Sequence, residues 1–208
     1  VIESSPHICE KGEYLYRGPS CPKCGKPFEG GGNEGWLCSE CMTRKRFFAK
    51  VFPAFLYRGE LRKMLIEFKY MRKTAGIKNL CEVLAMKISA HPTLPDVLIP
   101  VPLSKERLRR RGFNQSAIIA KTVSKFLNIP VDYDLLVRKK DTPPLFGLSK
   151  GERFKALRDA FYLTSKPDYR RVCLIDDIMT TGATVEACAR ILLKNGVDEV
   201  YVGVIGRD

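Results

Sequence analysis

The spacing of apolar and polar residues along this 208-residue chain predicts alternating strands and helices. Apolar runs of the length typical of buried strands occupy residues 97–101, 172–175 and 200–205, and shorter extended segments lie near 135–137 and 160–163. Apolar residues recur at helical spacing in residues 60–70, 77–90 and 185–194. Asn114 is a suitable N-cap for a further helix that runs to Leu127. This alternation predicts an α/β fold, with a parallel sheet covered by helices on both faces.

Two polar segments follow predicted strands, and ligands of parallel sheets bind at the carboxyl ends of strands. In the first segment, residues 172–184, four apolar residues lead to Asp176 and Asp177 and then to a small turn rich in hydroxyl groups. A strand that passes through a tight loop into a helix offers free backbone N–H groups to a phosphate. We assign phosphate binding to the loop residues Thr180, Thr181, Gly182, Ala183 and Thr184.

The two carboxylates at the entrance of this loop suit the hydroxyl groups of a sugar or a hydrated Mg²⁺. Together with the loop, Asp176 and Asp177 therefore predict a site for a ribose that carries a 5′-phosphate. The alternative is that both acids are solvated, and that the threonines only cap a helix and form a turn.

The second polar segment leaves the strand at 97–101 and is rich in arginine. A turn at Leu103, Ser104 and Lys105 would present free amides to a pyrophosphate. Guanidinium groups can add charge-assisted hydrogen bonds to such a ligand. The segment supplies them from Arg107, Arg109, Arg110 and Arg111. The alternative is a solvated basic loop.

Four cysteines near the N-terminus have the spacing of a structural metal site. They form two CxxC pairs, Cys21 with Cys24 and Cys38 with Cys41. Four thiolates at this spacing predict a closed tetrahedral site for structural Zn²⁺, whereas a redox motif would need a single CxxC in a βαβ context. Residues 1–46 hold few apolar side chains, so we expect zinc to supply most of the folding energy of this module. Residues 47–208 then form the main domain.

The formal net charge of +13 and the isoelectric point near 9.5 predict a polyanionic partner. Basic residues between 58 and 73 are interleaved with Tyr57, Phe68 and Tyr70, and Arg138 begins another basic run. Rings that stack on bases beside cations that neutralise phosphates favour single-stranded nucleic acid. We assign nucleic-acid binding to Arg107, Arg109, Arg110, Arg111, Lys139 and Lys140. The alternatives are a basic surface without a specific partner and aromatic residues that belong to the core.

The sequence predicts a cytoplasmic protein. No apolar run approaches the ~20 residues that cross a bilayer, and no signal peptide opens the chain. Eight cysteines without secretory features indicate thiols and metal rather than disulfides.

Three motifs together resemble the ComF family of competence and DNA-uptake proteins. They are CPKCG at 21–25, PVPLSKERLRRRGFNQ at 100–115 and LIDDIMTTGAT at 174–184. The resemblance implies a zinc knuckle joined to a type I phosphoribosyltransferase-like domain. In that domain Asp176 and Asp177 hold the ribose 2′ and 3′ hydroxyls of 5-phosphoribosyl 1-pyrophosphate (PRPP), residues 180–184 hold its 5′-phosphate, and the loop after the first core strand binds pyrophosphate with Mg²⁺.

The resemblance also implies cellular partners. Members of the family handle incoming single-stranded DNA on the cytoplasmic side of the membrane, alongside a helicase-like competence ATPase, and contact the inner membrane only peripherally. The chain departs from the family at Gly12, where many relatives complete a further CxxC after Cys9. It also lacks two amide side chains in the long loop 138–160, where Ala156 replaces an asparagine. These changes weaken a fixed catalytic role for that loop.

Three functions follow from these features. The first is a DNA-uptake protein that binds single-stranded DNA and uses its phosphoribosyl pocket for PRPP or for a 5′-phosphorylated sugar of DNA. The alternative is a Mg²⁺-dependent phosphoribosyltransferase that acts on an unidentified base or amine and releases pyrophosphate. A third is a regulatory PRPP sensor.

Overall fold

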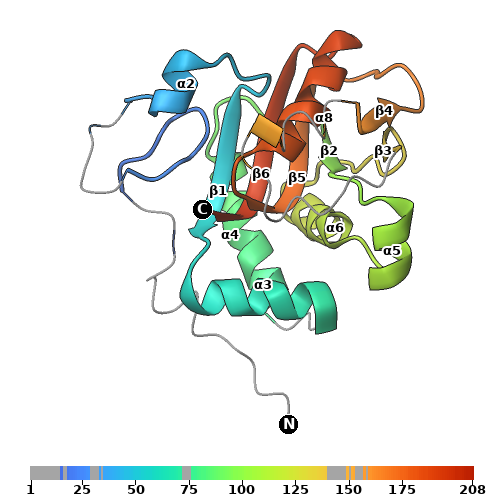
Figure 1. The fold of residues 1–208 in the computed structure, drawn as a ribbon, viewed down its shortest axis with the longest axis horizontal. Coiled ribbons are helices and arrows are strands. Elements are labelled where there is room, and N and C mark those ends of the chain that lie inside the picture. The colour runs from blue at the N-terminus through green and yellow to red at the C-terminus, as the bar shows by residue number, and fades with distance from the viewer. Residues whose placement is uncertain are drawn as a thin grey trace.

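The computed structural model describes residues 15, 18–28, 33, 35–71, 76–139, 149, 151–152, 157 and 159–208 (Figure 1). The first half of the chain contains α2 (Ser39–Thr43), β1 (Lys50–Leu56), α3 (Gly59–Met71), α4 (Ile77–Ser89), β2 (Val97–Pro100) and α5 (Lys105–Arg111). The second half contains α6 (Gln115–Leu127), β3 (Leu136–Arg138), β4 (Phe161–Leu163), β5 (Arg171–Met179), α8 (Ala183–Lys194) and β6 (Glu199–Arg207).

The main sheet is parallel, as predicted, with the strand order β1-β6-β5-β2. Because every strand runs in the same direction, the carboxyl ends of all four lie along one edge. Pro100 of β2, Met179 of β5 and Arg207 of β6 end there. This edge carries both polar segments that the sequence pointed to.

Alternate residues of each strand supply two separate apolar cores, one on each face of the sheet. On β5, Val172 and Leu174 pack in the core that includes α8 and the four cysteines. Cys173 and Ile175 face the other core, which contains residues of α3, α4 and α6. Figure 1 shows α8 and these other helices on opposite sides of the sheet. The predicted coverage of both faces is confirmed.

The predicted helices are present within a few residues of their expected bounds. Among the described residues, the spacing did not anticipate three further elements, α2, β1 and α5. Strand β1 is apolar almost throughout and contains Pro53, which is tolerated because β1 is an edge strand of the sheet. Residues 105–111, expected to form a loop, form helix α5. The extended segments near 135–137 and 160–163 pair with each other as an antiparallel hairpin, β3 with β4, outside the main sheet.

Among the described residues, no helix combines the length and the apolar character that a membrane crossing requires.

Candidate phosphate and sugar site

The acid pair lies inside strand β5 and does not follow it. The strand continues to Met179, where the apolar run had predicted an end near Ile175, because Asp176 and Ile178 still pair with β6. Both carboxylates are therefore held by the sheet itself at its carboxyl edge. A rigid strand fixes their positions more closely than a loop would.

Asp176 is held by two short hydrogen bonds. The Ser116 hydroxyl at the start of α6 donates to Asp176 Oδ1 at 2.9 Å, and the backbone N–H of Asp177 donates to the same oxygen at 2.9 Å. Burial raises the pKa of Asp176 to about 7; the charge of Asp177 adds to the rise, and Lys69 and Ser116 oppose it. The carboxyl group can therefore take up or release a proton near neutral pH.

Asp177 is only 7% exposed and forms an ion pair with Lys69 of α3. Lys69 Nζ lies 2.8 Å from Asp177 Oδ2, and Asp177 Oδ1 accepts the backbone N–H of Ile178 at 2.8 Å. Burial lowers the pKa of Lys69, but the charge of Asp177 and the hydrogen bond to it outweigh burial, so the pKa lies above its ordinary value. Lys69 therefore stays protonated and offsets part of the negative charge of the site.

Of the phosphate loop predicted at 180–184, residues 180–182 connect β5 to α8, whereas Ala183 and Thr184 form the start of α8. Gly182 is the N-cap of α8 and has a φ of 77°, which favours glycine. A Cβ atom here would lie 2.6 Å from Cε of Met179, so a side chain at this position would require the end of Met179 to move. The Thr181 hydroxyl accepts the N–H of Ala183 at 3.4 Å, while Thr180 is exposed. Helix α8 therefore begins four residues after Met179 ends β5, and its first turn carries backbone N–H groups that have no partner within the helix.

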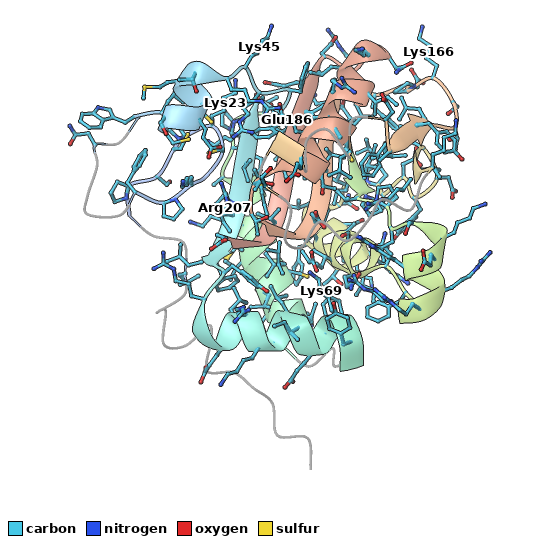
Figure 2. The ribbon with its side chains drawn as sticks, in the orientation of Figure 1. Lys23, Lys45, Lys69, Lys166, Glu186 and Arg207 are labelled. Carbon is cyan, nitrogen blue, oxygen red and sulfur yellow. The ribbon has the colours of Figure 1, made fainter. Side chains whose placement is uncertain are left out.

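Arg207, at the end of β6, holds the start of this loop by hydrogen bonds to its backbone carbonyls. Its side chain is buried, and Nη1 donates to the carbonyls of Met179 at 3.0 Å and Thr180 at 2.7 Å. Figure 2 shows Arg207 and Lys69 at the same end of the sheet. No sequence motif indicates Arg207, Lys69 or Ser116, because each of them reaches the site from a different element.

The segment 103–111 contributes a basic helix at the same edge. Ser104 is buried and caps α5, since its Oγ accepts the N–H of Arg107 at 3.4 Å. Lys105, Arg109 and Arg110 are exposed, whereas Leu103, Arg107 and Arg111 are partly buried. The proposed pyrophosphate turn is thus the start of a helix, and its serine hydroxyl is already used in the cap.

Arg111 links α5 to the acid pair. Its guanidinium lies 5.4 Å from the centre of the Tyr70 ring on α3, and its charge acts on neighbouring Lys69. Tyr70 is 64% exposed, whereas Phe68 is fully buried and Tyr57 partly buried. Of the three aromatic residues singled out by the sequence, Tyr70 has the exposed ring, and it lies beside an arginine.

The second basic run is only partly a surface feature. Arg138 is 5% exposed and lies over the ring of Phe161 at 5.5 Å, so it belongs to the β3–β4 hairpin rather than to a basic patch. Lys139 is exposed, and Lys140 lies outside the described residues. The long loop 138–160 is likewise described only in part, and Ala156 lies outside that part.

The four predicted metal ligands come together. The sulfur atoms of Cys21, Cys24, Cys38 and Cys41 all lie within 4.8 Å of one another, and all four residues are buried. Four sulfurs around a tetrahedral zinc ion lie about 3.8 Å apart, given Zn–S bonds of about 2.3 Å. Burial raises the pKa of Cys24 and of Cys41, so a cation is needed to hold these thiols as thiolates. The cluster therefore fits a metal ion such as zinc. His7 and Cys9 lie outside the described residues.

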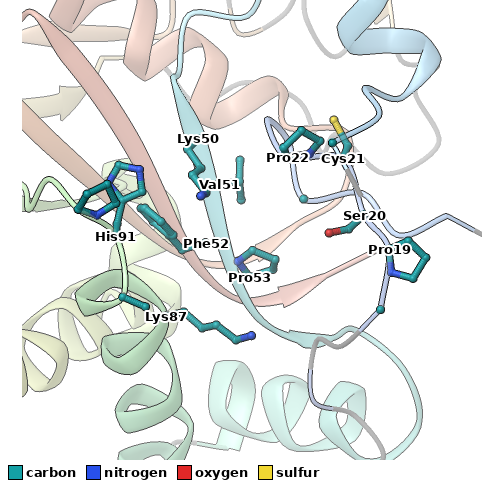
Figure 3. A pocket seen from close by; sticks show the side chains of 15 residues that line it. Pro19, Ser20, Cys21, Pro22, Lys50, Val51, Phe52, Pro53, Lys87 and His91 are labelled. Carbon is teal, nitrogen blue, oxygen red and sulfur yellow. The ribbon is translucent and has the colours of Figure 1, made fainter. Parts of the chain in front are cut away.

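A separate open cleft of about 380 Å³ lies between the cysteine module and the start of β1. Figure 3 shows Ser20 and Pro22 on one side, Lys87 and His91 on the other, and Phe52 and Pro53 of β1 between them. None of the residues that line this cleft belongs to the acid pair, to the phosphate loop or to α5. The phosphate and sugar site is instead formed at the strand ends.

Comparison with known proteins identifies relatives along nearly the whole chain. No protein-family model matches the sequence. The chain is 32% identical to Competence protein F of Haemophilus influenzae over 197 residues, which cover 91% of this chain and 85% of that protein. It is 30% identical to DNA utilization protein YhgH of Escherichia coli over 192 residues, with coverage of 90% and 83%. Among solved structures, a purine phosphoribosyltransferase from Pyrococcus horikoshii is similar over 62% of this chain and 70% of its own, with a TM-score of 0.38 and 20% identity.

The cysteine cluster predicts bound metal that stabilises the chain. We expect about one zinc ion per purified chain, and we expect C38S and C41S to lose it. The loss should lower the midpoint of thermal unfolding by about 8 °C, as expected when about 4 kcal/mol of ligand binding is removed from a chain of this size. Elemental analysis and calorimetry measure both effects. C81S, which alters a buried thiol outside the cluster, should keep the metal; full metal content in C38S and C41S would contradict the prediction.

The raised pKa of Asp176 predicts a stability that depends on pH. Between about pH 4 and about pH 7 the folded chain keeps a proton that the unfolded chain has released, so the contribution of this group falls as the pH rises through that interval. D176N should flatten the dependence, as measured by urea unfolding at about pH 5 and about pH 8. The exposed Asp168 provides the control, since D168N should leave the wild-type dependence in place. Equal pH dependence in D176N and the wild type would refute the assignment.

Proposed function

Because this chain belongs to the ComF family of competence and DNA-utilization proteins, we propose that it serves DNA uptake by binding single-stranded DNA and carries a pocket for a 5-phosphoribosyl ligand. The observation that carries the pocket is the arrangement at the edge of the sheet, where a buried acid pair stands beside a phosphate loop and the start of α8. Carboxylates suit hydroxyl donors, and helix N-termini suit phosphate. A ribose 5-phosphate unit has both hydroxyl donors and a phosphate.

The same chemistry favours PRPP over the 5′ end of DNA. Asp177 is buried and Asp176 is partly buried, so acceptor oxygens that are left without a donor reduce the binding energy. The free sugar of PRPP offers its 2′ and 3′ hydroxyls to these acids. The sugar of DNA has no 2′ hydroxyl, and its 3′ oxygen is esterified. We therefore assign the pocket to a free phosphoribosyl compound and place DNA binding elsewhere on the chain.

Mg²⁺ fits this proposal as a partner of PRPP. The diphosphate of PRPP provides oxygen ligands of the kind that Mg²⁺ prefers, and Asp176 and Asp177 would complete the binding of the hydrated ion. Asp177 already forms an ion pair with Lys69, so only the carboxylate of Asp176 is without a cationic partner in this pair. We therefore expect Mg²⁺ to bind together with PRPP and not before it.

The DNA surface is best sought along α5 and the end of α3. Arg109 and Arg110 are exposed on α5, and Arg111 lies over the exposed ring of Tyr70. An aromatic ring beside arginines supports base stacking together with neutralisation of phosphates. A helicase-like competence ATPase as partner, a peripheral contact with the inner membrane and a cytoplasmic location remain part of the proposal on the basis of family membership.

Transferase activity is the second candidate function. The positive charges of Lys69 and Arg111 near the acid pair are suited to stabilise a departing diphosphate. In that reaction a base or amine would attack C1 of the ribose, and the bond from C1 to the diphosphate oxygen would break. We place binding ahead of catalysis, because the relatives of this chain are named for competence and DNA utilization and not for a transferase activity.

DNA binding can be tested by its dependence on salt. R109A/R110A removes two exposed charges from α5, so the slope of log affinity against log salt should become shallower by about 1.4, from about 0.7 for each lost phosphate contact with a single strand. Fluorescence anisotropy of a labelled oligonucleotide measures the slope.

The matched control for this test is K166A/K194A. It removes the same charge from two exposed positions, Lys166, which lies near the opposite end of the sheet (Figure 2), and Lys194, which ends α8. This variant should leave the slope unchanged. Equal slopes for the two double variants would place DNA binding away from α5. Wild-type protein that fails to bind the oligonucleotide near physiological salt would refute the DNA-binding proposal.

The pocket can be tested by calorimetric titration with PRPP and Mg²⁺. D176N and D177N each weaken a hydrogen bond from a ribose hydroxyl, so the affinity should fall at least about tenfold in either variant. The exposed variant D168N should bind as the wild type does, and ribose 5-phosphate should bind more tightly than 2-deoxyribose 5-phosphate.

A pyrophosphate assay with a panel of bases and amines separates the two candidate functions. Binding without release of pyrophosphate supports the preferred function. Release that depends on an acceptor and is abolished by D176N and D177N would establish the transferase instead. PRPP that alters DNA affinity without being consumed would identify a sensor.

A further inference from the structure

The guanidinium of Arg207 touches both the cysteine module and the phosphate loop. Nε donates to the carbonyl of the metal-ligand residue Cys24 at 3.0 Å, while Nη1 donates to the carbonyls of Met179 and Thr180. The side chain is 4% exposed, so these bonds do not compete with bulk water. A single planar group thus connects two sites that lie far apart in the sequence.

A second contact fixes the module against the helix that follows the loop. Arg46, which lies just after the last cysteine, places Nη1 3.5 Å from the carboxylate of Glu186 on α8 and Nη2 2.8 Å from that of Glu40. Glu186 also accepts the backbone N–H of Phe47 at 3.0 Å. The cysteines pack in the same apolar core as Met179, Ala183 and Val185. The module is therefore part of the support of the phosphate loop.

We propose that Arg207 is a positioning residue through which metal in the cysteine cluster fixes the phosphate loop, so that a loaded cluster strengthens the binding of a 5-phosphoribosyl ligand. The inference rests on the proposed phosphoribosyl pocket and adds a regulator to it. Arg207 itself contacts carbonyls and does not reach the ligand.

The geometry of the peptide bond explains how a bond on one side of the loop orients the other side. In a trans peptide the carbonyl and the following N–H point in opposite directions, and the described chain has no cis peptide bonds. The carbonyls of Met179 and Thr180 point toward Arg207, so the N–H groups of Thr180 and Thr181 point away from it. Those N–H groups face the side from which a phosphate would approach.

The metal acts at the other end of this connection. The turn that places the Cys24 carbonyl is held by hydrogen bonds from Gly25 N–H to the Cys21 carbonyl and from Cys21 N–H to the Lys26 carbonyl, both at 2.9 Å. Small thiolate modules lose their fold without metal. Arg207 Nε would then lose a fixed acceptor, and the loop carbonyls would lose a fixed donor. By linkage, a phosphoribosyl ligand must in return raise the affinity of the cluster for metal.

The experiment compares wild type, R207K and R171K as full-length chains, each with zinc and after removal of zinc by a chelator. R207K keeps the positive charge, but the lysine ammonium lacks the planar guanidinium that donates to the carbonyls of Cys24, Met179 and Thr180 at the same time. R171K is the matched control, because Arg171 lies at the opposite end of β5 and pairs with Asp96 at 2.9 Å. PRPP affinity is measured by calorimetry, and hydrogen exchange of the amides of residues 180–184 is followed without ligand.

Removal of zinc should weaken PRPP binding to wild type and R171K about tenfold, whereas R207K should bind weakly with zinc and change little without it. Amide exchange in the loop should rise in wild type after zinc removal and in R207K with zinc present. Unchanged exchange and affinity in zinc-loaded R207K would overturn the inference. If zinc-loaded wild type fails to bind PRPP, the proposed pocket is wrong, and the exchange of the loop amides alone decides the role of Arg207.

Discussion

The parallel pairing of β5 with β6 sets the positions of the acid pair, the start of the loop and Arg207. Its register places Asp176 opposite Val204 and Met179 opposite Arg207, so the acids, the start of the loop and the buried arginine end at one edge. A shift of one residue would turn the carboxylates to the other face of the sheet and separate Arg207 from the loop. The register is secured by alternate apolar residues that fill two different cores, including Leu174 on one face and Ile175 on the other.

Burial of two adjacent acids is unfavourable, and the surrounding elements compensate for it in different ways. α3 contributes the cation Lys69 to Asp177, and α6 contributes the Ser116 hydroxyl to Asp176, whose pKa of about 7 lets it remain protonated at little cost. Asp177 is paired with a cation and Asp176 with a hydroxyl. Both carboxyl groups still have oxygen lone pairs that can accept hydrogen bonds from the hydroxyls of a ligand. The arrangement therefore trades stability of the free protein for a prepared binding site.

The sequence predicted the parts of the fold that depend on local pattern. Helical spacing and the Asn114 cap located α3, α4, α6 and α8, and the cysteine spacing predicted a cluster that the structure assembles. Strand β1 was missed because it is apolar throughout and contains Pro53, and α5 because seven mostly charged residues show no apolar stripe. Arg207, Lys69 and Ser116 could not be predicted, since their roles arise from the register and helix placement that only the folded chain provides.

Charge separates the two binding functions assigned to this chain. Around the acid pair, Lys69 offsets the charge of Asp177, and the raised pKa of Asp176 reduces the negative charge further near neutral pH, so the site suits a sugar with its phosphate at the loop. Long-range attraction of a polyanion instead needs unpaired, exposed cations, which α5 supplies in Arg109 and Arg110. Arg111, over Tyr70 and near Lys69, lies between the two surfaces.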